Sequence, residues 1–128
     1  ETMEMPGGDE TILVAEDEEP VRDAICHTLS TLGYTVFCAA NGEEALQLAS
    51  AERPALHLLL TDVVMPGLDG KDLALRLKET YPDLRILFIS GYSDETIVAH
   101  DLLDAKTAFL QKPFTAPALA RKVRAMLD

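Results

Sequence analysis

Short apolar runs alternate with longer amphipathic stretches along almost the whole chain, and this alternation is the feature that most constrains the fold. We expect strands at 11–15, 34–38, 56–60, 84–89 and 107–110. We expect helices at 20–32, 43–51, 71–80, 93–103 and after Thr115. Because strands and helices joined by short links favour parallel pairing with right-handed crossovers, the pattern predicts a (βα)5 α/β domain.

Composition limits the class of protein further. The 128 residues suit one domain, and the 48% hydrophobic content supports a packed core. A formal net charge of -11 argues against nucleic-acid binding and against an anionic membrane surface. No apolar run is long enough for a membrane span, so we expect a cytoplasmic chain, with a parent protein that could be membrane-anchored.

Two other features concern the chain's start and its cysteines. Residues 1–10 are polar and predict a linker or remnant of a longer protein, with the domain at 11–128. Cys26 and Cys38 show no metal-binding or redox spacing, so we expect two reduced, partly buried thiols.

Polar side chains stand where four of the predicted strands end. Glu16 and Asp17 follow the first strand, Asp62 the third, Ser90 the fourth and Lys112 the fifth. The carboxyl ends of parallel strands line one crevice, where ligands bind in open α/β sheets. Carboxylates, a hydroxyl and an ammonium meeting there suit a divalent cation together with a phosphoryl group.

The acidic residues point to the metal. Neighbouring carboxylates repel one another unless a cation neutralises them, and Glu16, Asp17 and Asp62 offer the oxygen ligands that Mg²⁺ prefers. The alternative is a set of solvated charges favoured by a helix N-terminus. That alternative suits Glu18 and Glu19 better than Asp17.

Four segments in order carry a resemblance to a known family. They are residues 13–18 (LVAEDE), 61–70 (TDVVMPGLDG), 89–92 (ISGY) and 110–114 (LQKPF). From about Thr11 to Leu127 the chain resembles a two-component receiver domain, the phosphoacceptor module of bacterial response regulators and hybrid histidine kinases. The resemblance implies a doubly wound, flavodoxin-like (CheY-like) five-stranded parallel sheet with strand order 2-1-3-4-5.

The same resemblance implies a role for each matching residue. Asp62 would be the phosphoacceptor and would bind Mg²⁺ directly with Asp17, while Glu16 would act through water. The backbone carbonyl of Val64 would complete the protein ligands. Ser90 and Lys112 would each contact a phosphoryl oxygen.

Three further expectations follow from the resemblance. Ser90 and Phe109 would form the conformational switch, although Phe109 replaces the commoner Tyr and could instead be ordinary core. The apolar Val64 and Tyr92 beside the site lead us to expect slow autodephosphorylation. The Lys112–Pro113 bond is expected to be cis.

The favoured interpretation is a receiver domain in a His–Asp phosphorelay. As its parent protein, a hybrid sensor histidine kinase is favoured over a standalone regulator. Its partners would be a kinase phosphohistidine domain and a histidine phosphotransfer protein, and it could dimerise through the fourth helix, fifth strand and fifth helix. It would catalyse its own phosphorylation and dephosphorylation, yet act as a switch. One alternative is a pseudo-receiver that binds proteins without phosphorylation. Another is a Mg²⁺-dependent phosphatase, disfavoured because Val64 stands where a second carboxylate would be needed.

Overall fold

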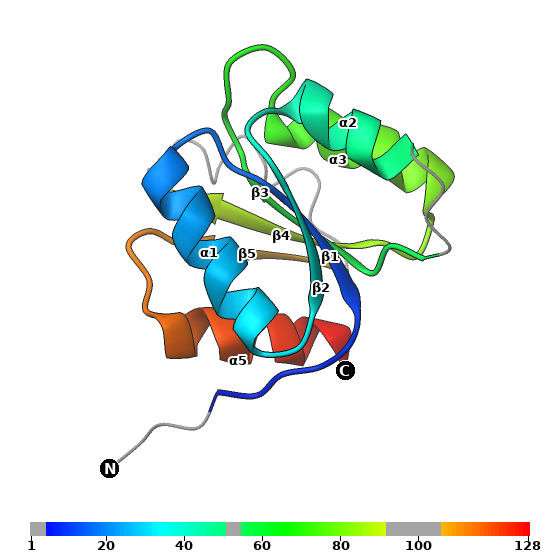
Figure 1. The fold of residues 1–128 in the computed structure, drawn as a ribbon. Coiled ribbons are helices and arrows are strands. Elements are labelled where there is room, and N and C mark those ends of the chain that lie inside the picture. The colour runs from blue at the N-terminus through cyan, green and yellow to red at the C-terminus, as the bar shows by residue number, and fades with distance from the viewer. Residues whose placement is uncertain (1–4, 51–54, 92–105) are drawn as a thin grey trace.

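The computed structural model describes residues 5–50, 55–91 and 106–128. Its strands are β1 (Thr11–Ala15), β2 (Thr35–Ala39), β3 (Leu58–Asp62), β4 (Arg85–Ser90) and β5 (Thr107–Gln111). They pair in parallel in the order β2-β1-β3-β4-β5 (Figure 1). The predicted fold class and strand order are therefore confirmed.

Helices cover both faces of this sheet. They are α1 (Glu19–Thr31), α2 (Gly42–Ser50), α3 (Gly70–Thr80) and α5 (Ala116–Leu127). Helices α1 and α5 lie on one face, and α2 and α3 lie together on the other (Figure 1). Within the described ranges, none of the helices combines the length and the apolar character that crossing a bilayer requires. The helix expected over 93–103, and Tyr92 before it, lie outside the described residues.

The central strand explains why two separate cores form. Leu59 packs into the core under α2 and α3, whereas Leu58 and Leu60 pack into the core under α1 and α5. All five residues of β3 are buried, as expected for an apolar parallel strand covered on both faces.

Side-chain caps are seen at the starts of α3 and α5. Asp69 accepts a hydrogen bond from the backbone N–H of Asp72 at the start of α3. Thr115 accepts one from the backbone N–H of Ala118 at the start of α5, the helix expected after Thr115. Each cap satisfies an otherwise unpaired N–H group in the first turn.

Strand β3 does not lie where the apolar run predicted it. The run suggested 56–60, but the ladder covers Leu58–Asp62, with Thr61 paired to Ala15 of β1 and Asp62 to Ile89 of β4. Backbone pairing continues through polar residues because it uses only N–H and C=O groups. Asp62 is thus the last residue of its strand, and His57, expected inside it, is exposed and precedes it.

The expectation of two free thiols is wrong. Cys26 of α1 and Cys38 of β2 form a disulfide, with their Cα atoms 6.6 Å apart. Helix α1 packs beside β2, and this brings the two residues within the usual Cα–Cα range for a bridge.

Arg124 of α5 belongs to a network of ion pairs and hydrogen bonds. Its guanidinium donates to both carboxylate oxygens of Glu10, at 3.2 and 2.6 Å, and to the carbonyl of Gly7 at 3.0 Å. A further hydrogen bond of 3.0 Å reaches Asp128. Arg124 therefore holds the segment before β1 against α5.

Candidate functional site

The carboxyl edge of the sheet brings the predicted polar residues together. Glu16 follows β1, Asp62 ends β3, Ser90 ends β4 and Lys112 follows β5. Glu16, Asp62 and Ser90 are 0%, 6% and 2% exposed, so these polar groups are inside the fold and not on its surface. Asp17, next in the chain, is exposed.

Three carboxylates form one cluster at this edge. Glu16, Asp17 and Asp62 each offer an oxygen, and these oxygens all lie within 4.8 Å of one another. Such a spacing lets one small cation contact or approach all three groups.

Lys112 is the cation nearest to these carboxylates among the described residues. Its Nζ lies 2.9 Å from Asp62 Oδ1 and 3.1 Å from Glu16 Oε1. It also lies 3.2 Å from Glu18 Oε1, at the exposed rim. One ammonium against the three clustered carboxylates leaves a formal excess of two negative charges.

The surroundings of Asp62 favour its neutral form when no other cation is present. Burial raises the pKa of Asp62 to about 9, and the hydrogen bond and charge of Glu16 act in the same direction, while Lys112 opposes them. Burial lowers the pKa of Lys112, but its hydrogen bond to Asp62 and the charges of Asp62 and Glu16 outweigh burial and raise it. The lysine is therefore charged across the physiological pH range.

The donor set fits Mg²⁺. Among the described residues, Glu16 Oε1 is buried without a hydrogen bond of good geometry, and the Lys112 ammonium, 3.1 Å away, is the cation beside it. A buried oxygen of this kind can still accept a hydrogen bond from a water ligand of a metal ion. The three residues supply only oxygen, which is what a hard divalent ion prefers.

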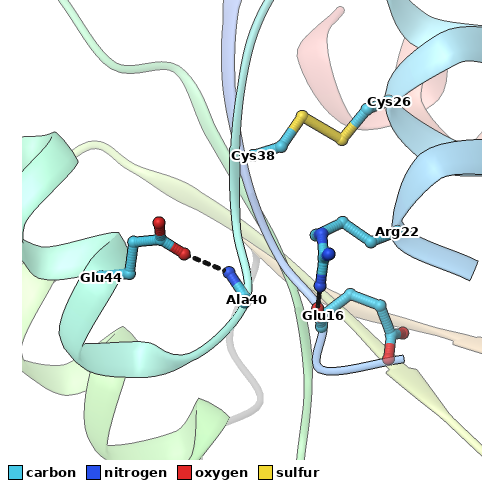
Figure 2. Close-up of a disulfide and its surroundings, with 6 residues drawn as sticks. All are labelled: Glu16, Arg22, Cys26, Cys38, Ala40 and Glu44. Atoms are coloured by element: carbon cyan, nitrogen blue, oxygen red, sulfur yellow. Dashed lines mark hydrogen bonds between the residues drawn. A yellow bond between two sulfur atoms is a disulfide. The ribbon is translucent and has the colours of Figure 1, made fainter. Parts of the chain in front are cut away.

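Neighbouring elements fix the backbone of Glu16 on both sides. Its N–H donates to the carbonyl of Ala39 at the end of β2, at 3.1 Å. Its carbonyl accepts from Arg22 Nη1 of α1 at 3.0 Å (Figure 2). Its Oε2 accepts from the N–H of Glu18 at 3.0 Å. Glu16 is therefore positioned by contacts from both α1 and β2.

The loop after Asp62 is held just as closely. The N–H of Gly70 donates to the carbonyl of Val63 at 2.8 Å, which closes the loop. A Cβ at Gly70 would collide with the carbonyl oxygen of Asp62, so only glycine allows α3 to begin this close to the site. Glu43 of α2 accepts from the N–H of Leu68 at 3.1 Å and holds the far side of the loop.

The remaining predicted residues lie around this centre. Val64, two residues past Asp62, is 54% exposed. The carbonyl of Ser90 accepts from the N–H of Lys112 at 2.8 Å, so β4 and β5 are joined at the site. Phe109 is partly buried and stacks on Phe88 with ring centroids 5.5 Å apart. The Lys112–Pro113 bond is cis, as expected.

Two contributors were missed from the sequence. Glu18, interpreted as a solvated helix charge, forms an ion pair with Lys112. Arg22 received no role, although it lies one turn into α1 and only six residues after Glu16. A basic residue in the first turn of a helix, where acidic residues are favoured, was the available signal.

Comparison with known proteins agrees with this geometry. The family model of the response regulator receiver domain matches residues 12–124. The chain is 40% identical over 121 residues to the sensor kinase CckA of Brucella abortus, covering 94% of this chain and 13% of that protein. It is 36% identical over 116 residues to the response regulator receiver protein CpdR of the same organism, covering 91% of this chain and 95% of CpdR.

A solved structure is similar as well. The crystal structure of the receiver domain from the hybrid histidine kinase CckA matches with a TM-score of 0.79 and 36% identity, covering 92% of this chain and 99% of that one. The fold and the acidic edge define a CheY-like receiver module of the two-component type. The chain belongs to the response regulator receiver domain family.

Proposed function

We propose that this domain is a phosphoacceptor in a bacterial His–Asp phosphorelay and that Asp62 receives the phosphoryl group. The observation that carries the proposal is the cluster of Glu16, Asp17 and Asp62 at the carboxyl edge of a receiver fold, with Lys112 paired to Asp62 and Glu16. Asp17 and Asp62 would bind Mg²⁺ directly, Glu16 through a water molecule, and the carbonyl of Val64 would complete the protein ligands. We assign the function to residues 11–128.

The chemistry is a nucleophilic displacement at phosphorus. A carboxylate oxygen of Asp62 attacks the phosphorus of a phosphohistidine, the P–N bond breaks, and an acyl phosphate forms on Asp62. Bound Mg²⁺ supplies charge neutralisation at the transferred group. Lys112, already 2.9 Å from Asp62, pairs with one phosphoryl oxygen, and the hydroxyl of Ser90 donates to another. Water later hydrolyses the acyl phosphate, and the apolar, exposed Val64 beside Asp62 supports slow hydrolysis.

Phosphorylation signals through a local conformational change that alters a more distant part of the domain. Ser90 moves toward the phosphoryl group, and Phe109 follows into the space behind it. The support for this step is the position of Phe109 on β5, stacked on Phe88 and only partly buried. Because Phe109 has no hydroxyl, its rotation changes packing without changing a hydrogen bond.

The similarity to a receiver domain of a hybrid histidine kinase favours such a kinase as the parent protein, with this domain as a cytoplasmic part of it. The chain spans 13% of CckA and 49% of the response regulator MprA of Mycobacterium ulcerans, so the parent's activity is part of the proposal. Its partners would be a phosphohistidine domain and a histidine phosphotransfer protein. An apolar groove of about 380 Å³ between α1 and α5 reaches Lys112 and offers a helix of either partner a place to dock; its lining includes Val21, Ile25, Pro113 and Phe114.

Intact-protein mass after incubation with acetyl phosphate tests the proposal. We expect one phosphoryl addition that requires Mg²⁺ and is absent in Asp62→Asn. Asp23→Asn, an exposed carboxyl change on α1, should still be phosphorylated and is the matched control. No addition to a folded wild-type protein would reject phosphorylation and favour a pseudo-receiver that acts by protein binding alone.

A further inference from the structure

The disulfide lies where it can act on the candidate site. Cys26 is one helical turn after Arg22 on α1, and Cys38 directly precedes Ala39 at the end of β2 (Figure 2). Arg22 and Ala39 are the residues whose side chain and carbonyl hold the backbone of Glu16. The disulfide therefore joins the two supports of one buried carboxylate.

The contacts form a closed ring. From Glu16, one hydrogen bond leads to Arg22 and along α1 to Cys26, and the other leads to Ala39 and back along β2 to Cys38. The S–S bond closes the ring covalently. Two free thiols cannot stay at bonding distance, so reduction separates the sulfurs and removes the covalent link between α1 and β2 at this point.

The bridge is also accessible. β2 is an edge strand of the sheet, and Cys38 on it is exposed, whereas Cys26 is partly buried. Exposed disulfides are the ones that external thiolates attack readily. The sulfur of Cys38 is therefore the expected point of attack, with the sulfur of Cys26 as the leaving group.

We propose that Cys26 and Cys38 form a reversible dithiol–disulfide site that sets the affinity of the Glu16 cluster for a divalent cation. This inference rests on the proposed Mg²⁺-dependent function. The oxidised form holds α1 and β2 at the spacing that positions Glu16, and reduction weakens cation binding. Phosphorylation of Asp62 would then respond to the thiol–disulfide state of the surroundings.

The chemical step is thiol–disulfide exchange with a dithiol reductant. One thiolate of the reductant bonds to the sulfur of Cys38, the Cys26–Cys38 bond breaks, and Cys26 leaves as a thiolate that takes up a proton. The second thiolate of the reductant then displaces Cys38. Two electrons and two protons pass to the cysteines, and the reductant becomes a disulfide.

The test compares oxidised and dithiol-reduced forms of the whole domain. Alkylation followed by intact mass counts free thiols, and calorimetric titration with Mg²⁺ measures affinity. We expect no free thiol in the oxidised form, two in the reduced form, and Mg²⁺ binding roughly tenfold weaker after reduction, as for the loss of an outer-shell partner of a metal site. The Cys26→Ser/Cys38→Ser variant should bind Mg²⁺ with the affinity of the reduced form, and the reductant should not change that affinity.

The Arg22→Gln variant tests whether the disulfide changes Mg²⁺ affinity through Glu16 or only stabilises the fold. It breaks the α1 support of Glu16 but keeps both cysteines, so the Mg²⁺ affinities of its oxidised and reduced forms should differ much less than in the wild type. Two free thiols under oxidising conditions, or equal Mg²⁺ affinity in both wild-type forms, would overturn the inference. Absence of Mg²⁺ binding in both forms would overturn the proposed function as well, and the thiol count would still report whether the bridge forms.

Discussion

Replacing Asp62 with Asn should stabilise the domain when no divalent cation is present. The buried carboxyl of Glu16 lies within 4.8 Å of Asp62 and repels it by about 3.5 kcal/mol at an effective dielectric constant of about 20. Asp17 is exposed, so solvent screens its repulsion to about 1 kcal/mol. Lys112, at 2.9 Å, contributes about 6 kcal/mol of attraction.

These pair energies alone favour the charged Asp62 by roughly 1 to 2 kcal/mol, but burying the charge costs several kcal/mol and outweighs them. Burial is also the largest cause of the raised pKa of Asp62. We therefore expect Asp62→Asn to raise the free energy of unfolding by about 1–3 kcal/mol at pH 8 in a metal chelator.

The pH dependence of this effect has a definite sign. The pKa of Asp62 is about 9 in the folded protein and near 3.8 when unfolded, so the folded state binds the proton more tightly. Its contribution to wild-type stability is complete below about pH 4 and is lost as the pH rises toward 9. The advantage of Asp62→Asn should thus increase from pH 5 to pH 8.

Urea denaturation followed by circular dichroism measures these differences, since the chain has no Trp for fluorescence. Asp23→Asn is the control for a change of net charge. Mg²⁺ at about 100 times its dissociation constant should stabilise the wild type by about 2.7 kcal/mol. The difference in free energy of unfolding between Asp62→Asn and the wild type should then become smaller. Lower stability of Asp62→Asn at pH 8, or an equal difference at pH 5 and pH 8, would refute the electrostatic reasoning.

Two further substitutions test other contacts of the fold, each by urea denaturation. Arg124→Ala should lower the free energy of unfolding by about 1–2 kcal/mol because it releases the segment before β1, while Arg121→Ala, on the exposed side of α5, should change it by less than about 0.5 kcal/mol. A similar effect of both would show that the Arg124 network contributes nothing. Gly70→Ala should destabilise by about 2 kcal/mol or more, although Ala is normally the better helix former, because its Cβ meets the carbonyl of Asp62. Arg76→Ala, on the exposed face of α3, is its control, and a stabilised Gly70→Ala would contradict the close approach.

The sequence predicts the site well because strand ends are easy to recognise. Glu16, Asp62 and Lys112 each follow or end an apolar run, and parallel topology brings such positions to one edge whatever the details of packing. Their proximity was therefore predictable before any contact was known. The strand order itself came from the resemblance, since periodicity alone does not say which strands are neighbours.

The parts that sequence reasoning missed depend on contacts between distant elements. The pairing of Cys26 and Cys38 requires α1 to lie beside β2, and a separation of 12 residues carries no signal of it. Arg124 meets Glu10 across 114 residues, which no local pattern records. The shift of β3 arose because apolar side chains mark burial, whereas the ladder is made by backbone groups.

Locating the phosphoryl group by chemistry tests directly whether Asp62 is the phosphoacceptor. The domain would be phosphorylated with acetyl phosphate and Mg²⁺, reduced with borohydride so that an aspartyl phosphate becomes homoserine, digested, and sequenced by mass spectrometry. We expect homoserine at position 62 and at no other aspartate, only when Mg²⁺ is present. Homoserine at another position, or none after a phosphoryl addition has been observed, would contradict Asp62 as the phosphoacceptor.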